Sequence, residues 1–247
     1  YDLICHLVWR DFSLRYKRSV LGIFWSFILP LAQLMVLTFL FRKVIPLDID
    51  NYPAFVFTGL LPWTWFNACL NSSGILFISN RDLIRRPNFT PAILIIVNAL
   101  SNLINYLMAM PILFAILVLS GKTVTLALLY LPVLVLIQGV LIVGLGFFIS
   151  TLNVFYRDIQ PIMGVALTLL FYITPVFYQS ETVGERYRIL YELNPIAVLI
   201  QGYQSVFFYG IVPQWNLLLL TSVVSGVMCI IGYLIYRHYL HDIIDYL

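Results

Sequence analysis

Two long stretches without a charged side chain, joined by one short basic segment, constrain this chain most. Residues 52–80 and 87–121 contain no Asp, Glu, Lys or Arg. The segment between them contains Arg81, Asp82, Arg85 and Arg86. A charged side chain at the centre of a bilayer costs about 2.5–3.5 kcal/mol on insertion scales. The pattern therefore predicts two membrane-spanning helices joined by a charged cytoplasmic elbow.

The composition indicates the same class of protein. Of the 247 residues, 62% are hydrophobic and only 10% are charged, whereas about 25% of a soluble domain is charged. A helix needs roughly 20 residues to cross about 30 Å of hydrocarbon. Six apolar runs are that long: residues 20–41, 54–78, 92–120, 124–155, 159–178 and 215–236. We therefore predict an all-α integral membrane protein with six transmembrane helices in a single domain, residues 1–247.

Two other segments complete the expected architecture. Residues 1–19 combine apolar positions at helical spacing with a basic side, which predicts an amphipathic helix at the membrane surface. The same basic residues also suit a simple positive anchor for the next span. Residues 189–212 are nearly long enough to span, but Asn194 and Pro195 signal a turn or a helix start. We favour a broken re-entrant hairpin there over a seventh span, because non-helical backbone at that depth must be covered by protein.

The positions of Lys and Arg set the orientation. With six spans and the N-terminus inside, the cytoplasmic side holds Arg10, Arg15, Lys17, Arg18, Arg81, Arg85, Arg86, Arg157 and Arg237. The outer side holds Arg42, Lys43, Lys122, Arg186 and Arg188. The excess on the first side places both termini in the cytoplasm.

The six apolar runs contain no Asp, Glu, Lys, Arg or His. Proton-coupled pumps usually need such a group at membrane depth, and the sequence also has no G-x-x-x-x-G-K-[ST] loop for ATP phosphates. His238 and His241 are more typical of a solvated helix end than of a metal site. We expect no catalytic residue, no metal and no cofactor in this chain, so the energy for any pumping enters through another subunit.

Amide side chains form stripes in two of the runs. Asn98, Asn102 and Asn105 are spaced i, i+4 and i+7 in the third run, and Asn67 and Asn71 are four apart in the second. These stripes suit hydrogen bonds between helices, which are common in membranes. They equally suit a path for a hydroxyl-rich solute.

Small residues four apart predict close helix packing, because they let two backbones approach. Gly146 and Ser150 form such a pair in the fourth run, and Ser222 and Gly226 form one in the sixth. We predict that both pairs lie in contacts between helices.

Aromatic residues make up 16% of the chain. An interfacial belt is predicted to include Trp9, Trp63, Trp65 and Trp215. Deeper aromatic positions in the first and fifth runs include Phe24, Trp25, Phe171, Tyr172 and Tyr178. Packing or lipid contact is their ordinary role, and stacking on sugar rings is the alternative.

Several segments resemble, in order, the membrane subunits of type 2 ABC exporters of the polysaccharide-export branch, those for O-antigen above all. They are WRDFSLRYKRSVLGIFWSFILPL (residues 9–31), FTGLLPWTWF (57–66), NRDLIRRPNFTP (80–91), NVFYRDIQPI (153–162), YITPVFY (172–178) and LNPIAVLIQGYQSVFF (193–208). Each segment alone is a weak signal, whereas the ordered set covers nearly the whole chain.

The resemblance implies a homodimer in the bacterial inner membrane, bound to two copies of a soluble ATPase that holds ATP and Mg²⁺. Residues 81–89 would form the main coupling helix, the turn near Tyr156 a smaller contact, and residues 189–212 an outer gate. The cargo would be a polysaccharide on a polyprenyl-diphosphate lipid, and membrane lipid is the other partner. No nucleic acid is expected.

We assign residues to these expected roles. The ATPase contacts would be Arg81, Asp82, Arg85, Arg86, Phe89, Tyr156, Arg157 and Asp158. The diphosphate headgroup would meet Arg10, Arg15, Lys17 and Arg18 where the lipid enters. The channel would be lined by Phe24, Trp25, Asn98, Asn102, Phe171, Tyr172 and Tyr178.

Two other functions stay open. A type 2 exporter of a small molecule or drug would share the coupling parts and differ only in its channel lining. A membrane transferase acting on a lipid-linked sugar would normally need a base or carboxylate at membrane depth, and the apolar runs offer none.

Overall fold

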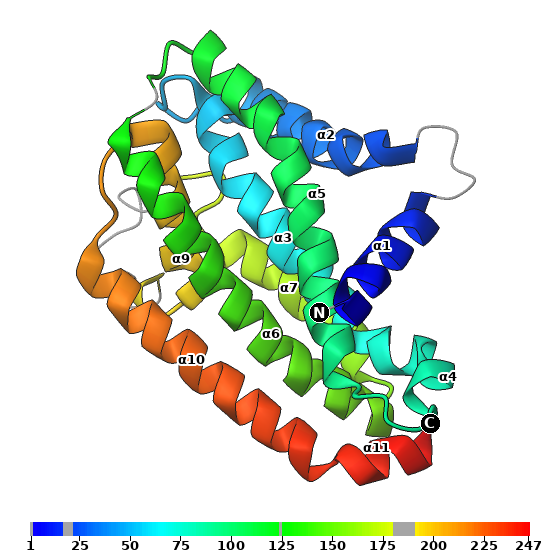
Figure 1. Ribbon diagram of the computed structural model, residues 1–247. Helices are drawn as coiled ribbons and strands as arrows, with labels where there is room; N and C mark the ends of the chain where they lie inside the picture. Colours follow the sequence, from blue (N-terminus) through cyan, green and yellow to red (C-terminus); the bar gives the residue numbers. More distant parts are fainter. Residues whose placement is uncertain (1, 17–21, 124, 180–190) are drawn as a thin grey trace.

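The computed structural model describes residues 2–16, 22–123, 125–179 and 191–247, and these parts of the chain contain helices and no β-strand (Figure 1). The principal helices are α2 (Trp25–Phe39), α3 (Tyr52–Ser79), α5 (Ala92–Leu119), α6 (Leu131–Phe155), α7 (Ile159–Ile173) and α10 (Trp215–His238). Other elements are α1 (Asp2–Tyr16), η1 (Gly22–Phe24), η2 (Leu40–Val44), α4 (Arg81–Ile84), η3 (Leu126–Tyr130), α9 (Pro195–Gln204), η6 (Ser205–Tyr209) and α11 (Leu240–Tyr246). One principal helix lies in each predicted apolar run, and the all-α class is confirmed.

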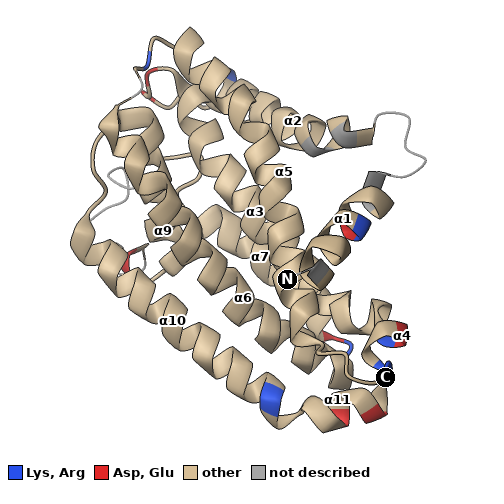
Figure 2. Ribbon diagram, in the orientation of Figure 1, with Lys and Arg blue, Asp and Glu red and all other residues tan. Residues whose placement is uncertain are grey.

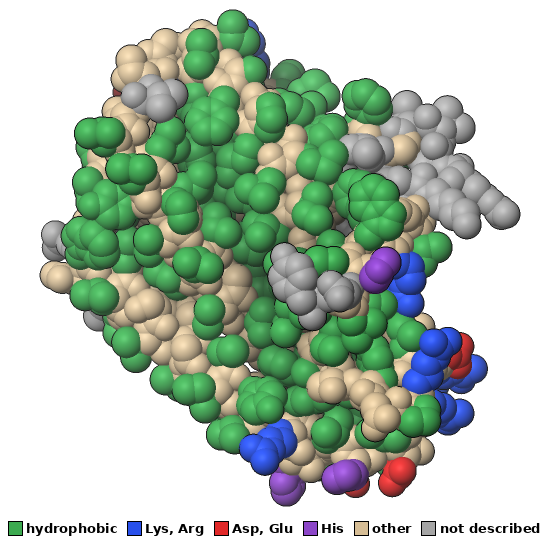
Figure 3. Space-filling model, viewed as in Figure 1, with side chains coloured by type: hydrophobic (Ala, Val, Ile, Leu, Met, Phe, Trp, Pro, Cys, Tyr) green, Lys and Arg blue, Asp and Glu red, His purple; other side chains and the backbone are tan. Residues whose placement is uncertain are grey.

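Four described segments are long and apolar enough to cross a membrane: Phe27–Val44, Ala92–Leu119, Leu126–Phe155 and Trp215–His238. Most charged side chains lie at two opposite ends of these helices (Figure 2). The face in Figure 3 is covered largely by hydrophobic side chains between those ends. The chain is therefore a multi-pass membrane protein.

The helix α3 is the centre of the bundle. It packs against α2, α5, α6, α7 and α9, and most of its residues are buried. Although it has 28 residues, it is not among the four apolar segments, because asparagine, serine and threonine lower its hydropathy. A helix surrounded by other helices meets protein rather than lipid, so it carries these polar side chains wherever a neighbour binds them.

The helices α6 and α10 run side by side and approach closely at two glycines (Figure 1). A Cβ atom added to Gly232 would lie 2.2 Å from the carbonyl oxygen of Gly144, and one added to Gly144 would lie 2.6 Å from the backbone of Cys229. Contacts this short are sterically excluded, so both positions need glycine.

Of the two predicted small-residue pairs, one is confirmed and one is wrong. The Ser150 hydroxyl donates a 2.8 Å hydrogen bond to the Ser73 carbonyl on α3, and a Cβ added to Gly146 would lie 3.3 Å from the Ser73 hydroxyl. Gly226 has no described atom within 4 Å of such a Cβ. The pair of Ser222 and Gly226 therefore does not form the close contact of α10, which lies instead at Gly232.

The fifth predicted run, residues 159–178, is helical only as far as Ile173. The backbone then becomes extended at Thr174, and two of its carbonyl groups find side-chain donors. The Gln204 amide donates to the Pro175 carbonyl at 2.9 Å, and the Tyr52 hydroxyl donates to the Phe177 carbonyl at 2.9 Å. Non-helical backbone is stable among apolar helices when the protein's own groups hydrogen-bond to it in this way.

The helix α9 begins at Asn194, whose side chain accepts a hydrogen bond from the backbone N–H of Ile196. This is an N-cap, and Pro195 follows at the first helical position. Nearly all of α9 is buried against α3, α6 and α10. The chain turns at Gly210, with φ of 66°, where the Thr125 hydroxyl donates to its carbonyl at 3.0 Å.

Candidate functional site

The predicted coupling segment, residues 81–89, is helical only over α4. It begins where α3 ends at Asn80, and it stops at Arg85, because Pro87 disfavours helical backbone before it. Asn88 then takes a left-handed conformation, with φ of 63°. Ile84 is fully buried and fixes α4 to the bundle, so the segment is a short helix followed by a turn.

The charged side chains of this segment point into solvent. Arg81 Nε and Asp82 Oδ1 lie 3.8 Å apart, and both side chains are strongly exposed. Arg85 and Arg86 are also exposed. Phe89 is only partly exposed, because its ring packs against the protein's own apolar cluster around Ile84. The four charged residues thus form part of the accessible surface at this end of the molecule.

The second predicted contact lies at the same end. Tyr156, Arg157 and Asp158 are all exposed in the turn between α6 and α7. Phe155, just before them, packs against the cluster that holds Ile84, and its ring lies 5.4 Å from that of Tyr246 on α11. The structure therefore brings the turn, α4 and α11 together (Figure 2).

The helix α1 packs on α5 and is linked to the elbow. The Arg10 guanidinium donates a 3.2 Å hydrogen bond to the Asn80 side-chain oxygen at the end of α3. The Arg15 side chain, Lys17 and Arg18, to which we assigned a headgroup role, lie outside the described residues.

The asparagine stripe of α5 is hydrogen-bonded to α3 at Asn98. Asn98 is 5% exposed. Its amide donates to the Cys69 carbonyl at 3.0 Å and to the Ser73 hydroxyl at 3.3 Å. Its side-chain oxygen accepts from Ser72 at 2.7 Å and from Asn102 at 2.9 Å. Asn98 therefore links α5 to α3 and does not face an open path for a solute.

Replacing Asn98 with leucine should therefore reduce stability. Interhelical hydrogen bonds in membranes contribute about 0.6 kcal/mol on average, and Asn98 makes three of them, to Cys69, Ser72 and Ser73, so the expected loss is about 2 kcal/mol. Thermal unfolding of the purified protein measures this loss, with exposed Asn216→Leu on α10 as the control. Equal stability of N98L and N216L would contradict the structural role.

The aromatic residues assigned to a channel divide into two groups. Phe24, Trp25 and Tyr172 are exposed. Phe171 packs within the bundle, with its ring 5.5 Å from that of Trp63. The Tyr178 hydroxyl donates to the Ile173 carbonyl at 2.7 Å and closes the end of α7. Trp63 on α3 thus meets both groups, because it lines a pocket with Trp25 and its ring contacts that of Phe171.

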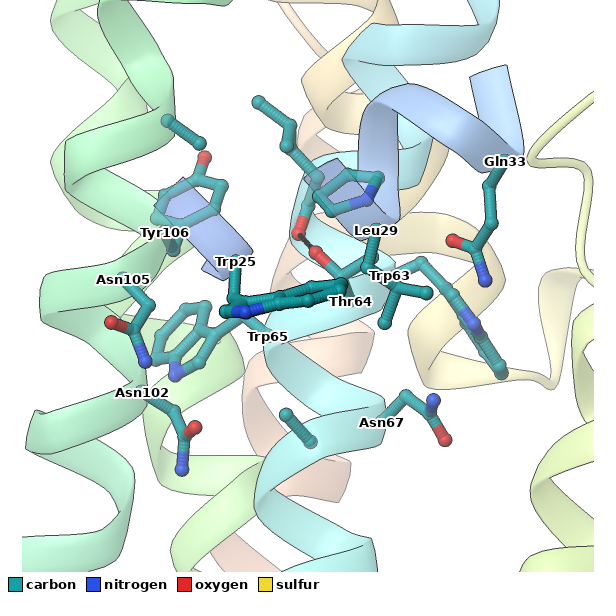
Figure 4. Close-up of a pocket in the computed structure, with 14 residues that line it drawn as sticks. Trp25, Leu29, Gln33, Trp63, Thr64, Trp65, Asn67, Asn102, Asn105 and Tyr106 are labelled. Atoms are coloured by element: carbon teal, nitrogen blue, oxygen red, sulfur yellow. Dashed lines mark hydrogen bonds between the residues drawn. The ribbon is translucent and has the colours of Figure 1, made fainter. Parts of the chain in front are cut away.

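A pocket of about 480 Å³ lies where α2, α3 and α5 meet (Figure 4). It is lined by Trp25, Leu29, Pro30, Gln33, Leu61, Trp63, Thr64, Trp65, Asn67, Ala68, Asn102, Asn105, Tyr106 and Ala109. Of the residues assigned to the channel, only Trp25 and Asn102 line it. The prediction that Trp63 and Trp65 belong to an interfacial belt is wrong, because both are buried near the middle of α3.

The pocket has no ionisable carboxylate, imidazole, amine or guanidinium in its lining, so it offers no acid–base pair. Within the described residues, no group of three His, Cys, Asp or Glu side chains comes close enough to hold a metal ion. What the lining does offer is apolar ring surface together with neutral hydrogen-bonding groups.

A family model of ABC-2 type transporters matches residues 2–208, and the chain belongs to this family. Over 238 residues it is 29% identical to the O-antigen export system permease protein RfbA of Klebsiella pneumoniae, covering 96% of this chain and 92% of that protein. A protein of the same name from Myxococcus xanthus is 32% identical over 92% of this chain and 88% of its own length. The polysialic acid transport protein KpsM of Escherichia coli is 22% identical over 92% of this chain and 90% of its own length.

Proposed function

We propose that this chain is the membrane subunit of an ATP-driven exporter of O-antigen-like polysaccharide. The observation that carries the proposal is the match, over nearly the whole chain, to relatives named as O-antigen export permeases. The sequence contains no phosphate-binding loop of the G-x-x-x-x-G-K-[ST] type. The energy then comes from a separate ATPase subunit.

The ATPase docks at the end of the bundle that carries α4. Its contact residues are Arg81, Asp82, Arg85, Arg86, Phe89, Tyr156, Arg157 and Asp158. The exposure of the charged residues supports this role, since arginine is enriched among residues that dominate interface energetics. Phe89 contributes at the edge of the contact, because part of its ring is already used in the chain's own packing.

The subunit crosses the bacterial inner membrane six times, with both termini in the cytoplasm. Two arguments support six spans. The helix α3 is long enough, and α7 extends about 22 Å before the non-helical residues 174–179 continue the crossing. The predominance of Lys and Arg at the α4 end supports a cytoplasmic position for that end. Residues 189–212 then form the re-entrant outer gate, and the burial of α9 within this range supports that position.

The working transporter is a homodimer with two ATPase subunits, and its cargo is carried on a polyprenyl diphosphate. Arg10, Arg15, Lys17 and Arg18 lie on or just after α1 and bind the diphosphate as the lipid enters. Arginine forms charge-assisted, often bidentate, hydrogen bonds with phosphate oxygens, and this chemistry supports the assignment.

Depletion of this protein in its native cell tests the function. We expect surface polysaccharide to disappear and lipid-linked polymer to accumulate on the cytoplasmic side, because synthesis continues while export stops. Restoring the protein from a plasmid should reverse both effects. Unaltered surface polysaccharide without trapped polymer would contradict the proposal and favour export of a small molecule.

A further inference from the structure

The pocket between α2, α3 and α5 lies at mid-depth of the helical bundle. Its lining residues on α3 and α5 fall near the middle of each of these 28-residue helices. Its volume of about 480 Å³ is within the range of small-molecule sites. Three indole rings and several amides surround the same space (Figure 4).

Some of its hydrogen-bonding capacity is unused within the described part of the chain. Asn67 accepts a 2.9 Å hydrogen bond from Asn71, but its own NH₂ group donates none. The Gln33 amide and the Trp63 indole N–H make no hydrogen bond among the described residues. Polar groups at this depth need partners, because leaving them unpaired in an apolar layer is costly.

The chemistry of the lining restricts the occupant. A lipid acyl chain would leave the Asn67 NH₂ group and the Gln33 amide without a partner. A phosphate would need a cationic side chain for a charge-assisted bond, and a metal ion would need carboxylate ligands; the lining has neither. An uncharged molecule with several hydroxyl groups and an apolar face satisfies both the amides and the indole rings.

We propose that this pocket binds uncharged sugar rings of the transported polysaccharide and disfavours acidic sugars. The inference rests on the proposed function and adds a site and a charge preference to it. The indole faces of Trp25 and Trp63 receive the C–H face of a pyranose ring, while Asn67, Asn105 and Gln33 bond its hydroxyls. A sugar carboxylate would lose hydration there without gaining a cationic partner, and burial of an unpaired charge is strongly unfavourable.

The test is a titration of the purified protein in lipid nanodiscs with neutral tetrasaccharides of mannose, galactose, glucose and rhamnose, followed by tryptophan emission. We expect at least one to bind, and an oligomer of sialic acid of the same length not to bind. Asn67→Leu should weaken binding about fivefold to tenfold, because a donor and an acceptor are lost. No change of emission with any neutral tetrasaccharide would overturn the proposal.

Asn71→Leu is the matched control. N67L and N71L lose the same hydrogen bond between the two asparagines, but Asn71 is not in the pocket lining. N71L should bind as the wild type does, and equal weakening in both variants would refute the site. Gln33→Lys, at an exposed position, should allow the sialic acid oligomer to bind.

Measuring surface polysaccharide in cells distinguishes a failure of this inference from a failure of the proposed function. If depletion of the protein abolishes surface polysaccharide while N67L binds and exports normally, the pocket is not the sugar site and the function stands. If depletion leaves surface polysaccharide unchanged, both the function and this inference fail.

Discussion

Gly232→Ala is expected to prevent the native packing of α6 against α10. The added methyl group would lie 2.2 Å from the Gly144 carbonyl oxygen. The oxygen belongs to the backbone of α6 and the methyl group is bonded to the backbone of α10, so neither can move without its helix. Relief requires the two helices to separate, which also weakens the contacts of Phe147 with Tyr233 and Tyr236. Overpacking of this kind costs about 3 kcal/mol, so the melting temperature of the purified protein should fall by about 10 °C.

Gly226→Ala on the same helix is the control. No described atom lies within 4 Å of its added Cβ, and alanine is favoured over glycine in a helix by about 1 kcal/mol. Thermal unfolding of both variants in the same detergent should therefore show a loss for G232A and no loss for G226A. Equal melting temperatures of G232A and the wild type would mean that α6 and α10 do not approach as described.

Replacing Arg85 and Arg86 together with alanine is expected to release the ATPase subunit. Both side chains are exposed, and neither has a hydrogen-bond partner among the described residues. Their removal should therefore leave the fold intact. Central arginines at an interface often account for 2 kcal/mol or more each, so retention of the ATPase during purification should fall at least about tenfold. Surface polysaccharide should be lost with it.

The double variant Arg42→Ala and Lys43→Ala removes the same charge at the opposite end of the bundle. Both residues are exposed in η2, so this variant should retain the ATPase and export normally. The amount of each variant in the membrane fraction controls for insertion. Normal retention and export by the first variant would exclude Arg85 and Arg86 from the coupling surface.

The positions of the helices could be predicted from the sequence because lipid demands long charge-free segments. The end of α7 was missed, although a local signal exists: Pro175 disfavours helical backbone at Thr174, which is extended. What no local signal gives is the partner of the freed carbonyl, because the Gln204 amide that reaches the Pro175 carbonyl lies 29 positions away in the chain. A local pattern cannot show a partner brought by tertiary packing.

The site was predictable in part, for the same reason. The charged elbow is evident from composition, whereas the pocket depends on how α2 crosses α3 and α5. The stripe spacing placed Asn98 and Asn105 on one face, but only the packing separates them: Asn98 is bound within the α3–α5 interface, and Asn105 lines the pocket. Asn105, seven positions after Asn98, thus belongs to the pocket, but the sequence alone could not distinguish it from Asn98.

The central position of α3 has a consequence for how the protein is made. Its modest hydropathy gives it a weaker tendency than the other long helices to leave the translocon for lipid. The partners of its polar side chains, among them Asn98 on α5 and Ser150 on α6, emerge later from the ribosome. The stable insertion of α3 in the bilayer therefore depends on segments that are translated after it. We expect α3 to be less stably inserted in a nascent chain arrested before α5 than in one arrested after α6.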